Sequence, residues 1–205
     1  MVRLTEGHMA LLHPLVDSKG NFGRHYSSNM AFAASRYTEV KLLPICNEIF
    51  GDIDKNTVEF VDNYDGTMKE PSLLPTAFPN ILVNPNQGIA VGMASNIASF
   101  NLREICAATT ALLKDKNANL GEFIEGPDFS TGGFLLRNDE VMEKIFSPGT
   151  GSVKVRAKYN YDKKQNIIEI TEIPYTTTIE AIIDKLTELI KGGKLRDLND
   201  VRDET

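Results

Sequence analysis

The segment from residue 57 to residue 88 constrains the fold of this chain more than any other. It contains four closely spaced prolines, Pro71, Pro75, Pro79 and Pro85. Each proline lacks a backbone N–H, so it cannot continue a helix or donate to a neighbouring strand. We therefore predict only short strands in an otherwise extended chain, and we place a boundary between two modules within this segment.

The residues before that boundary have a largely helical composition. Residues 1–12 predict a helix or the remnant of one, and residues 16–23 predict a loop punctuated by glycines. Residues 27–50 have mostly helical propensity after a serine or asparagine cap, with Pro44 as a break or as a first-turn residue of a second helix. We therefore expect mainly helices and loops in this part.

Strands are predicted at two places beyond the boundary. A short apolar run at residues 88–93 predicts a buried strand. Residues 151–175 predict a β-hairpin, because apolar residues alternate on both sides of the polar turn DKKQN. One face of this hairpin carries Lys154, Arg156 and Lys158, for which we favour a solvated basic surface over contact with a DNA backbone.

Two amphipathic helices are predicted in the same part. Residues 101–116 repeat apolar residues at helical spacing after an Asn101 cap. Residues 177–191 do so after a capping box of Thr177 and Glu180, and Gly192 is the expected stop. Helices and a hairpin in separate stretches predict a mixed α+β fold.

The composition is that of a soluble globular protein, with 41% hydrophobic residues, 24% charged residues and a net charge of −6. No apolar run approaches the roughly 20 residues needed to span a bilayer, and no signal peptide is recognisable. Cys46 and Cys106 form no paired motif, so we expect reduced thiols and a cytoplasmic location. Residues 1–41 carry a charge of +2 and the remainder −8, so only the N-terminal part has the electrostatics of a phosphate binder.

No residue cluster predicts a metal site. The three histidines all lie in the first 25 residues and outside any known motif, which favours surface or structural roles. Residues 52–63 begin like a calcium loop, but Thr57 stands where glycine is needed and Asn63 where glutamate is needed. Asp62 and Asp65 are better interpreted as turn formers.

The glycine-rich stretch NPNQGIAVGMASN, residues 84–96, leaves two interpretations open. It has neither the dinucleotide fingerprint nor the Walker lysine, so any ATP must bind elsewhere. Its glycines can allow a tightly packed strand. Alternatively, its polar residues meet a groove of DNA while the aliphatic side chain of Ile89 wedges between base steps.

Tyr37 directly follows Arg36 in the run MAFAASRYTEVKL. A phenol is a weak nucleophile unless a neighbouring base or cation helps it. In a regular helix the two side chains would point about 100° apart, so we expect Arg36 to grip a bound phosphate and not to touch the tyrosine. That arrangement suits phosphoryl transfer by tyrosine, although the dipeptide alone is more typical of a packed tyrosine beside an unrelated arginine.

Several segments, taken in order, resemble one protein family. They include LVDSKGNFG, AASRYTEVKL, VEFVDNYDGT, GIAVGMASNI, GPDFSTGG and EIPYTTT. Their order and spacing resemble those of the DNA breakage subunit of bacterial type IIA topoisomerases, the A subunits of DNA gyrase and topoisomerase IV. The resemblance implies that residues 1–68 are the C-terminal part of a winged-helix catalytic module. It implies that residues 69–205 are a mixed α/β tower domain, truncated at its C-terminal end.

The resemblance also implies roles for individual residues. Tyr37 would form a transient 5′-phosphotyrosyl bond with DNA, and Arg36 would assist it. Ile89 would intercalate into the duplex and bend it. Further DNA contacts are expected from Arg3, Lys41, Asn84, Asn86 and Gln87.

Partners and cofactors follow from the same resemblance. The substrate would be double-stranded DNA, and two A subunits would form a homodimer in an A2B2 enzyme that passes one duplex through another. Mg²⁺ and ATP would be held by the B subunit, and this chain would bind neither. Family members have further catalytic residues before position 1 and more domains after VRDET, so we expect a fragment that is inactive alone.

Gyrase and topoisomerase IV are not separated by these residues. Two other classes of function also remain open at this stage. A non-catalytic DNA-binding module would bend DNA without needing Tyr37. A structural or interaction domain would bury Tyr37 away from any basic surface.

Overall fold

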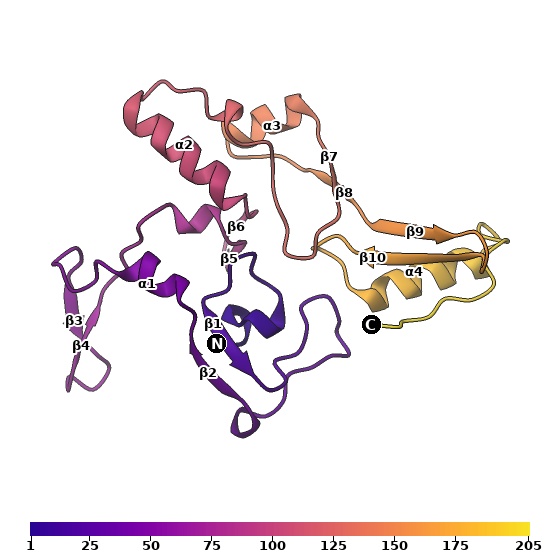
Figure 1. Cartoon of the computed structure of the whole chain (residues 1–205), viewed down its shortest axis with the longest axis horizontal. Coiled ribbons are helices and arrows are strands. Elements are labelled where there is room, and N and C mark those ends of the chain that lie inside the picture. Colours follow the sequence, from indigo (N-terminus) through magenta and orange to yellow (C-terminus); the bar gives the residue numbers. More distant parts are fainter.

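The computed structural model describes every residue of the chain, 1–205. Its strands form five separate two-stranded antiparallel sheets, and four α-helices accompany them (Figure 1). The predicted α+β class is confirmed by this mixture of helices and antiparallel hairpins.

The elements have the following bounds. The strands are β1 (Val16–Lys19), β2 (Glu39–Leu42), β3 (Phe60–Asp62), β4 (Lys69–Pro71), β5 (Asn86–Ala90), β6 (Met93–Ile97), β7 (Phe134–Leu136), β8 (Lys154–Arg156), β9 (Lys158–Asp162) and β10 (Ile167–Glu172). The α-helices are α1 (Ile45–Phe50), α2 (Leu102–Lys114), α3 (Asp139–Phe146) and α4 (Ile179–Lys191). Single turns of 3₁₀ helix are η1 (Val2–Leu4), η2 (Glu6–His8), η3 (Ser35–Tyr37), η4 (Asn80–Leu82) and η5 (Leu120–Glu122).

The N-terminal part contains less helix than the sequence predicts. The run 27–50 is helical only in η3 and in α1, which begins directly after Pro44 as expected. Glu39–Leu42 instead pairs with Val16–Lys19, inside the predicted loop, to make the β1–β2 hairpin. The helical propensity of residues 39–42 is overridden because Val16–Lys19, a strand distant in sequence, forms the backbone hydrogen bonds that a helix would have formed locally.

The proline-rich segment behaves as predicted, whereas the run at residues 88–93 does not. Only the three-residue strands β3 and β4 and the turn η4 form between Phe60 and Leu82. Beyond them, β5 and β6 make a hairpin whose strands are almost wholly exposed, so the prediction of a buried strand is wrong. Its apolar side chains face solvent because no other strand pairs with it and no element covers it.

The later elements match the predictions more closely. Helix α2 begins after Asn101, whose side-chain oxygen accepts from the Arg103 N–H at 3.0 Å. The predicted hairpin forms only from Lys158 onward, as β9 and β10, because Lys154–Arg156 (β8) pairs with β7 instead. Helix α4 ends at Lys191 with Gly192 as its C-cap, as expected. The predicted capping box is wrong, because the cap of α4 is Thr178, whose Oγ accepts from the Ala181 N–H.

Few side chains are buried, so the molecule has no single large core. Only 18 of 205 residues are buried. The main apolar cluster lies between α2, η4 and η5, and a second set of buried apolar residues belongs to the N-terminal part. The main cluster contains Val83, Phe100, Ile105, Ala108 and Ile124, and the N-terminal set contains Ala10, Val16, Phe22, Cys46 and Ile49.

The lobes spread outward from the N-terminal part (Figure 1). Helices α2 and α3 form one lobe, and the hairpin β3–β4 projects separately. The hairpin β9–β10 and helix α4 form another lobe, and the start of α4 faces the N-terminal segment. No helix has both the length and the apolarity to cross a membrane.

Replacing Ile105 by alanine should destabilise the α2 lobe. The side chain is 2% exposed and sits in the main cluster, so its removal should leave a cavity and cost about 2–5 kcal/mol of unfolding free energy. Leu113→Ala on the same helix is the matched control, since Leu113 is 83% exposed and should change the value by less than about 0.5 kcal/mol. Urea unfolding followed by circular dichroism measures both. Equal effects would contradict the assignment of this core.

Candidate nucleic-acid interface

Tyr37 closes the 3₁₀ turn η3 immediately before strand β2. Its N–H donates to the Ala34 carbonyl at 3.0 Å. The end of β1 lies next to this turn, because Lys19 pairs in the hairpin with Glu39, two residues after Tyr37. Gly20, with a φ of +107°, lies so close that a Cβ there would stand 2.8 Å from the Tyr37 carbonyl oxygen. Only glycine combines this left-handed backbone with such a close approach.

The side chains of Arg36 and Tyr37 lie together on the surface. Tyr37 is 68% exposed, which is not the geometry of a packed structural tyrosine. The Arg36 guanidinium carbon lies 4.8 Å from the centroid of the Tyr37 ring, a cation–π contact. The expectation that Arg36 would not touch the tyrosine is therefore wrong, because the angle between neighbouring Cβ atoms does not fix where the end of a long, flexible arginine side chain lies.

Two ion pairs join the strands on either side of this turn. Lys19 Nζ lies 3.2 Å from Glu39 Oε2, and Lys41 Nζ lies 3.2 Å from Asp17 Oδ2. Lys41 is thus exposed but already has a carboxylate partner. Exposed pairs of this kind contribute only about 0–1 kcal/mol, so a DNA phosphate could take the place of the carboxylate.

The exposed hairpin β5–β6 presents three of the predicted DNA contacts. Ile89 is 81% exposed, and Asn86 and Gln87 on the same strand are exposed as well. Side chains alternate along a strand, so Gln87 and Ile89 share one face and Asn86 occupies the other. The hairpin turn contains Gly92 with a φ of +80°, next to the fully exposed Val91.

Asn84 does not belong with this exposed group. It is 8% exposed, and its Oδ1 accepts from the His13 N–H at 2.8 Å while its Nδ2 donates to the His13 carbonyl at 2.9 Å. Both ends of its amide therefore have partners inside the molecule. The expectation of a DNA contact fails for Asn84, because the chain uses the amide to join the end of η4 to the N-terminal segment.

Arg3 lies in η1, near a seam where residues 8–30 contact residues 174–180. At this seam the rings of His25 and Tyr175 pack with centroids 4.4 Å apart, and the Tyr175 hydroxyl donates to the Ala10 carbonyl at 3.1 Å. Burial lowers the pKa of His25 and raises the pKa of Tyr175. The positive charge of Arg3 acts to lower both pKa values.

Glu180 at the same seam was not predicted as a functional residue. The sequence assigns it to the cap of its own helix, but its carboxylate accepts hydrogen bonds from Ser27, Ser28 and Asn29. These bonds, with that from the Ser27 hydroxyl the strongest contribution, lower the pKa of Glu180 to about 2. The only sequence signal for Glu180 is that it is an acidic residue in the first turn of the amphipathic helix α4.

The predicted basic face is divided between two sheets, with Lys154 and Arg156 on β8 and Lys158 on β9, and two of its three cations have partners within the molecule. Lys158 Nζ lies 3.0 Å from Glu172 Oε1, and the Arg156 guanidinium lies over the ring of Phe134 at 5.7 Å. This agrees with the interpretation as ordinary surface.

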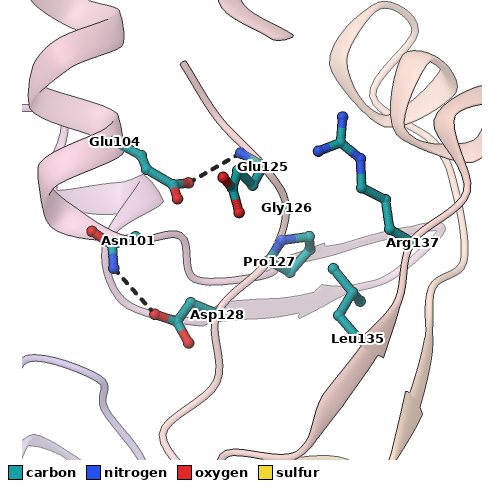
Figure 2. A pocket seen from close by; sticks show the side chains of 8 residues that line it. All are labelled: Asn101, Glu104, Glu125, Gly126, Pro127, Asp128, Leu135 and Arg137. Carbon is teal, nitrogen blue, oxygen red and sulfur yellow. Dashed lines mark hydrogen bonds between the residues drawn. The ribbon is translucent and has the colours of Figure 1, made fainter. Parts of the chain in front are cut away.

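A pocket of about 330 Å³ lies beside the start of α2 (Figure 2). Glu104 accepts from the Glu125 N–H at 3.2 Å, and Asn101 Nδ2 lies 3.5 Å from Asp128 Oδ2. The one cationic residue of its lining, Arg137, is paired with Asp139. Three carboxylates facing one paired arginine do not suit a DNA phosphate, and none of the predicted site residues lines this pocket.

Comparison with known proteins places these residues in a family. A model that describes the A subunit of DNA gyrase/topoisomerase IV matches residues 1–205. The chain belongs to the DNA gyrase/topoisomerase IV A-subunit family. The resemblance found from the sequence segments is thereby confirmed.

Individual members of the family are similar over the whole chain. The DNA gyrase A subunit of Streptomyces coelicolor is 42% identical and that of Borreliella burgdorferi 43% identical, each over 100% of this chain. The DNA topoisomerase 4 A subunit of Rickettsia conorii is 40% identical, also over 100% of the chain. The chain spans 24%, 26% and 28% of the lengths of these three relatives, about a quarter. Identities this close leave gyrase and topoisomerase IV unseparated.

Replacing Asn84 should affect stability more than DNA binding. Asn84→Ala leaves the N–H and the carbonyl of His13 without partners, which should cost about 1–3 kcal/mol of unfolding free energy. Asn86→Ala, two residues on but exposed, should change stability by less than about 0.5 kcal/mol. Thermal unfolding and DNA binding of both variants test this, and a DNA-binding loss specific to Asn84→Ala at unchanged stability would contradict it.

Proposed function

We propose that this chain is the part of a type II DNA topoisomerase A subunit that carries the DNA-cleaving tyrosine. One observation carries the proposal. In a member of this family, Tyr37 is exposed on a supported turn with the Arg36 guanidinium 4.8 Å from its ring centroid. A nucleophile and a cation are thus held together where a duplex could reach both.

The proposed reaction is the exchange of one phosphoester bond for another. The Tyr37 oxygen attacks the DNA phosphorus, forming the tyrosyl O–P bond as the bond from phosphorus to O3′ breaks. The phenolic proton leaves to solvent or a base, and the leaving O3′ takes up a proton. The product is a 5′-phosphotyrosyl link and a free 3′-hydroxyl. Attack by that hydroxyl reverses the step, and because the number of phosphoester bonds is unchanged, religation itself needs no ATP.

Arg36 is proposed to offset charge on the phosphate during this exchange. An exposed cation–π contact is worth about 0.5–1 kcal/mol. A charge-assisted hydrogen bond to a phosphate is worth about 1.5–3 kcal/mol. A bound duplex should therefore draw the guanidinium from the ring to the phosphate, where it stabilises the negative charge of the transition state.

The hairpin β5–β6 is proposed to deform the same duplex. An exposed aliphatic side chain on a narrow hairpin can enter between base pairs and kink the helix, and polar neighbours can contact the groove. Ile89 fits the first role and Asn86 and Gln87 the second, because all three are exposed. Arg3 and Lys41 are proposed as contacts to the DNA backbone.

Magnesium and ATP are proposed to be held by a B subunit. Within this chain no group of three or more His, Cys, Asp or Glu side chains is arranged to hold a metal ion. The carboxylate nearest to Tyr37 in sequence, that of Glu39, is engaged by Lys19. These residues do not fit a magnesium site, so no step here passes through the metal.

The larger assembly is proposed to be an A2B2 enzyme that acts on double-stranded DNA. Each of two A subunits would supply one Tyr37, giving a staggered double-strand break through which a second duplex passes at the expense of ATP. Within the chain, residues 1–68 are proposed as part of the winged-helix catalytic module and residues 69–205 as part of the tower domain. The 205-residue chain alone is proposed to be inactive, because it would lack the second tyrosine and the metal.

Tyr37→Phe in the complete enzyme, formed by the full-length A and B subunits, should eliminate covalent DNA cleavage. Loss of a nucleophile typically costs on the order of 10⁴-fold or more in rate, whereas removing one exposed hydroxyl should leave DNA affinity nearly unchanged. The matched control is Tyr64→Phe, a fully exposed tyrosine in the turn of β3–β4. Denaturing gels detect tyrosine-linked DNA. Normal cleavage by Tyr37→Phe, or equal loss of cleavage and binding, would refute the assignment.

Ile89→Ala in the same enzyme should weaken DNA bending. Losing the wedge should lower the affinity for the bent state by about 1–2 kcal/mol, roughly a 5- to 30-fold effect. Leu113→Ala removes an equally exposed aliphatic side chain from α2 and serves as the control. Energy transfer between dyes at the two duplex ends reports the bend, and an unchanged bend angle with Ile89→Ala would exclude the wedge.

A further inference from the structure

The carboxylate of Glu180 joins the first turn of α4 to the loop that precedes Tyr37. Its Oε1 accepts from the Ser27 hydroxyl at 2.5 Å and from the Asn29 N–H at 3.0 Å. Its Oε2 accepts from the Ser28 N–H at 3.1 Å. Three consecutive residues of the loop thus donate to one side chain more than 150 positions away in the sequence.

The loop tip is organised around Ser27. This serine is 6% exposed, and its Oγ also lies 3.3 Å from the backbone nitrogens of both Asn29 and Met30. Next to it, the Ile179 N–H donates to the Tyr26 carbonyl at 2.9 Å. In Figure 1 this loop lies beside the beginning of α4. The tip is therefore tied to α4 by its backbone as well as by the carboxylate.

The neck of the same loop leads directly to Tyr37. Phe22 and Phe32 form an antiparallel bridge, and the Ala33 N–H donates to the Asn21 carbonyl at 3.0 Å. The next residue, Ala34, supplies the carbonyl that accepts from the Tyr37 N–H. A short, hydrogen-bonded path therefore connects the anchored tip with the turn that carries the phenol.

We propose that Glu180 is a positioning residue for Tyr37, which latches the 24–34 loop to α4 and so holds η3 in the orientation that presents the phenol to DNA. This inference rests on the proposed function of Tyr37. Glu180 itself touches neither DNA nor the reacting atoms. The lowered pKa of Glu180 fits this role, since the latch keeps its charge at any physiological pH.

Glutamine at position 180 would break the latch with little change in shape. Both carboxylate oxygens accept hydrogen bonds in the structure, and the amide nitrogen of glutamine can only donate. In either orientation of the amide, at least one donor of the loop would face another donor. Ser27→Ala removes the hydroxyl that donates to Glu180 and, with it, the Oγ that accepts from the Asn29 and Met30 N–H groups.

The test uses the complete enzyme of full-length A and B subunits. Glu180→Gln, Ser27→Ala and the double variant are compared for the single-turnover rate of covalent cleavage, for DNA affinity and for the unfolding midpoint. We expect Glu180→Gln to slow cleavage roughly 10- to 100-fold, as for a misplaced reacting group, with DNA affinity within about twofold of wild type. The double variant should lose less than the product of the two single losses, because both act through one latch.

Two control variants match the chemistry without removing any hydrogen bond of the latch. Glu188→Gln alters an exposed carboxylate of the same helix, paired only with Lys185. Ser28→Ala removes a neighbouring hydroxyl, while the Ser28 contact to Glu180 uses the backbone N–H. Both controls should cleave DNA at the wild-type rate.

Other results would overturn the proposal. Wild-type cleavage by Glu180→Gln, or parallel loss of cleavage, affinity and folded protein, would make Glu180 dispensable or merely structural. If Glu180→Gln does not fold, Ser27→Ala decides by the same rate and affinity criteria. Failure of the proposed function is distinguishable, because Tyr37→Phe would then still cleave DNA, whereas failure of the latch alone leaves Tyr37→Phe inactive and Glu180→Gln normal.

Discussion

Hydrogen bonds from later segments to the first thirty residues hold this molecule together. Two-stranded hairpins are barely stable by themselves, and only 18 of 205 residues are buried, so apolar packing alone does not place the lobes. Hydrogen bonds between side chains and the backbone or side chains of distant segments fix the positions of the lobes instead. The Asn84 amide clamps His13, the Tyr175 hydroxyl binds the Ala10 carbonyl, and Glu180 gathers the loop at Ser27. Loss of one such bond leaves its partner unpaired, which makes these contacts sensitive points of the structure.

The candidate chemistry depends on this framework because its own parts are exposed. Tyr37 and Ile89 both extend from narrow structures, a single 3₁₀ turn and a two-stranded hairpin, with little packing around them. Their positions must therefore come from the supports behind them. For Tyr37 the supports are the β1–β2 pairing, the close approach of Gly20 and the anchored loop. Nucleophile, cation and wedge can thus remain accessible to a large substrate while the backbone that carries them is fixed.

Local signals in the sequence predicted the elements that are local in origin. Asn101 caps α2 as expected, the prolines limit β3 and β4 to three residues, and the polar turn produces the β9–β10 hairpin. The same reasoning failed for residues 27–50 and for the exposed hairpin at Ile89. For residues 27–50 the deciding partner was strand β1, which lies earlier in the chain. For the hairpin at Ile89 it was the lack of any further strand or helix that covers β5 and β6. The family was recognisable because many segments agreed in order, whereas no single motif sufficed.

The sequence by itself determined the family, the start of α2 at Asn101, the stop of α4 at Gly192 and the adjacent pair Arg36–Tyr37. These follow from covalent neighbours and local turn chemistry, which the order of residues alone contains. Only the tertiary structure decided where polar side chains find their partners. In the folded chain the Asn84 amide pairs with the backbone of His13, and the Arg36 guanidinium lies over the Tyr37 ring. The carboxylate of Glu180 accepts from Ser27 in the loop and does not cap its own helix. The physical reason is that a polar group brought out of water takes whichever partner the fold brings within reach, and that partner can lie far away in sequence.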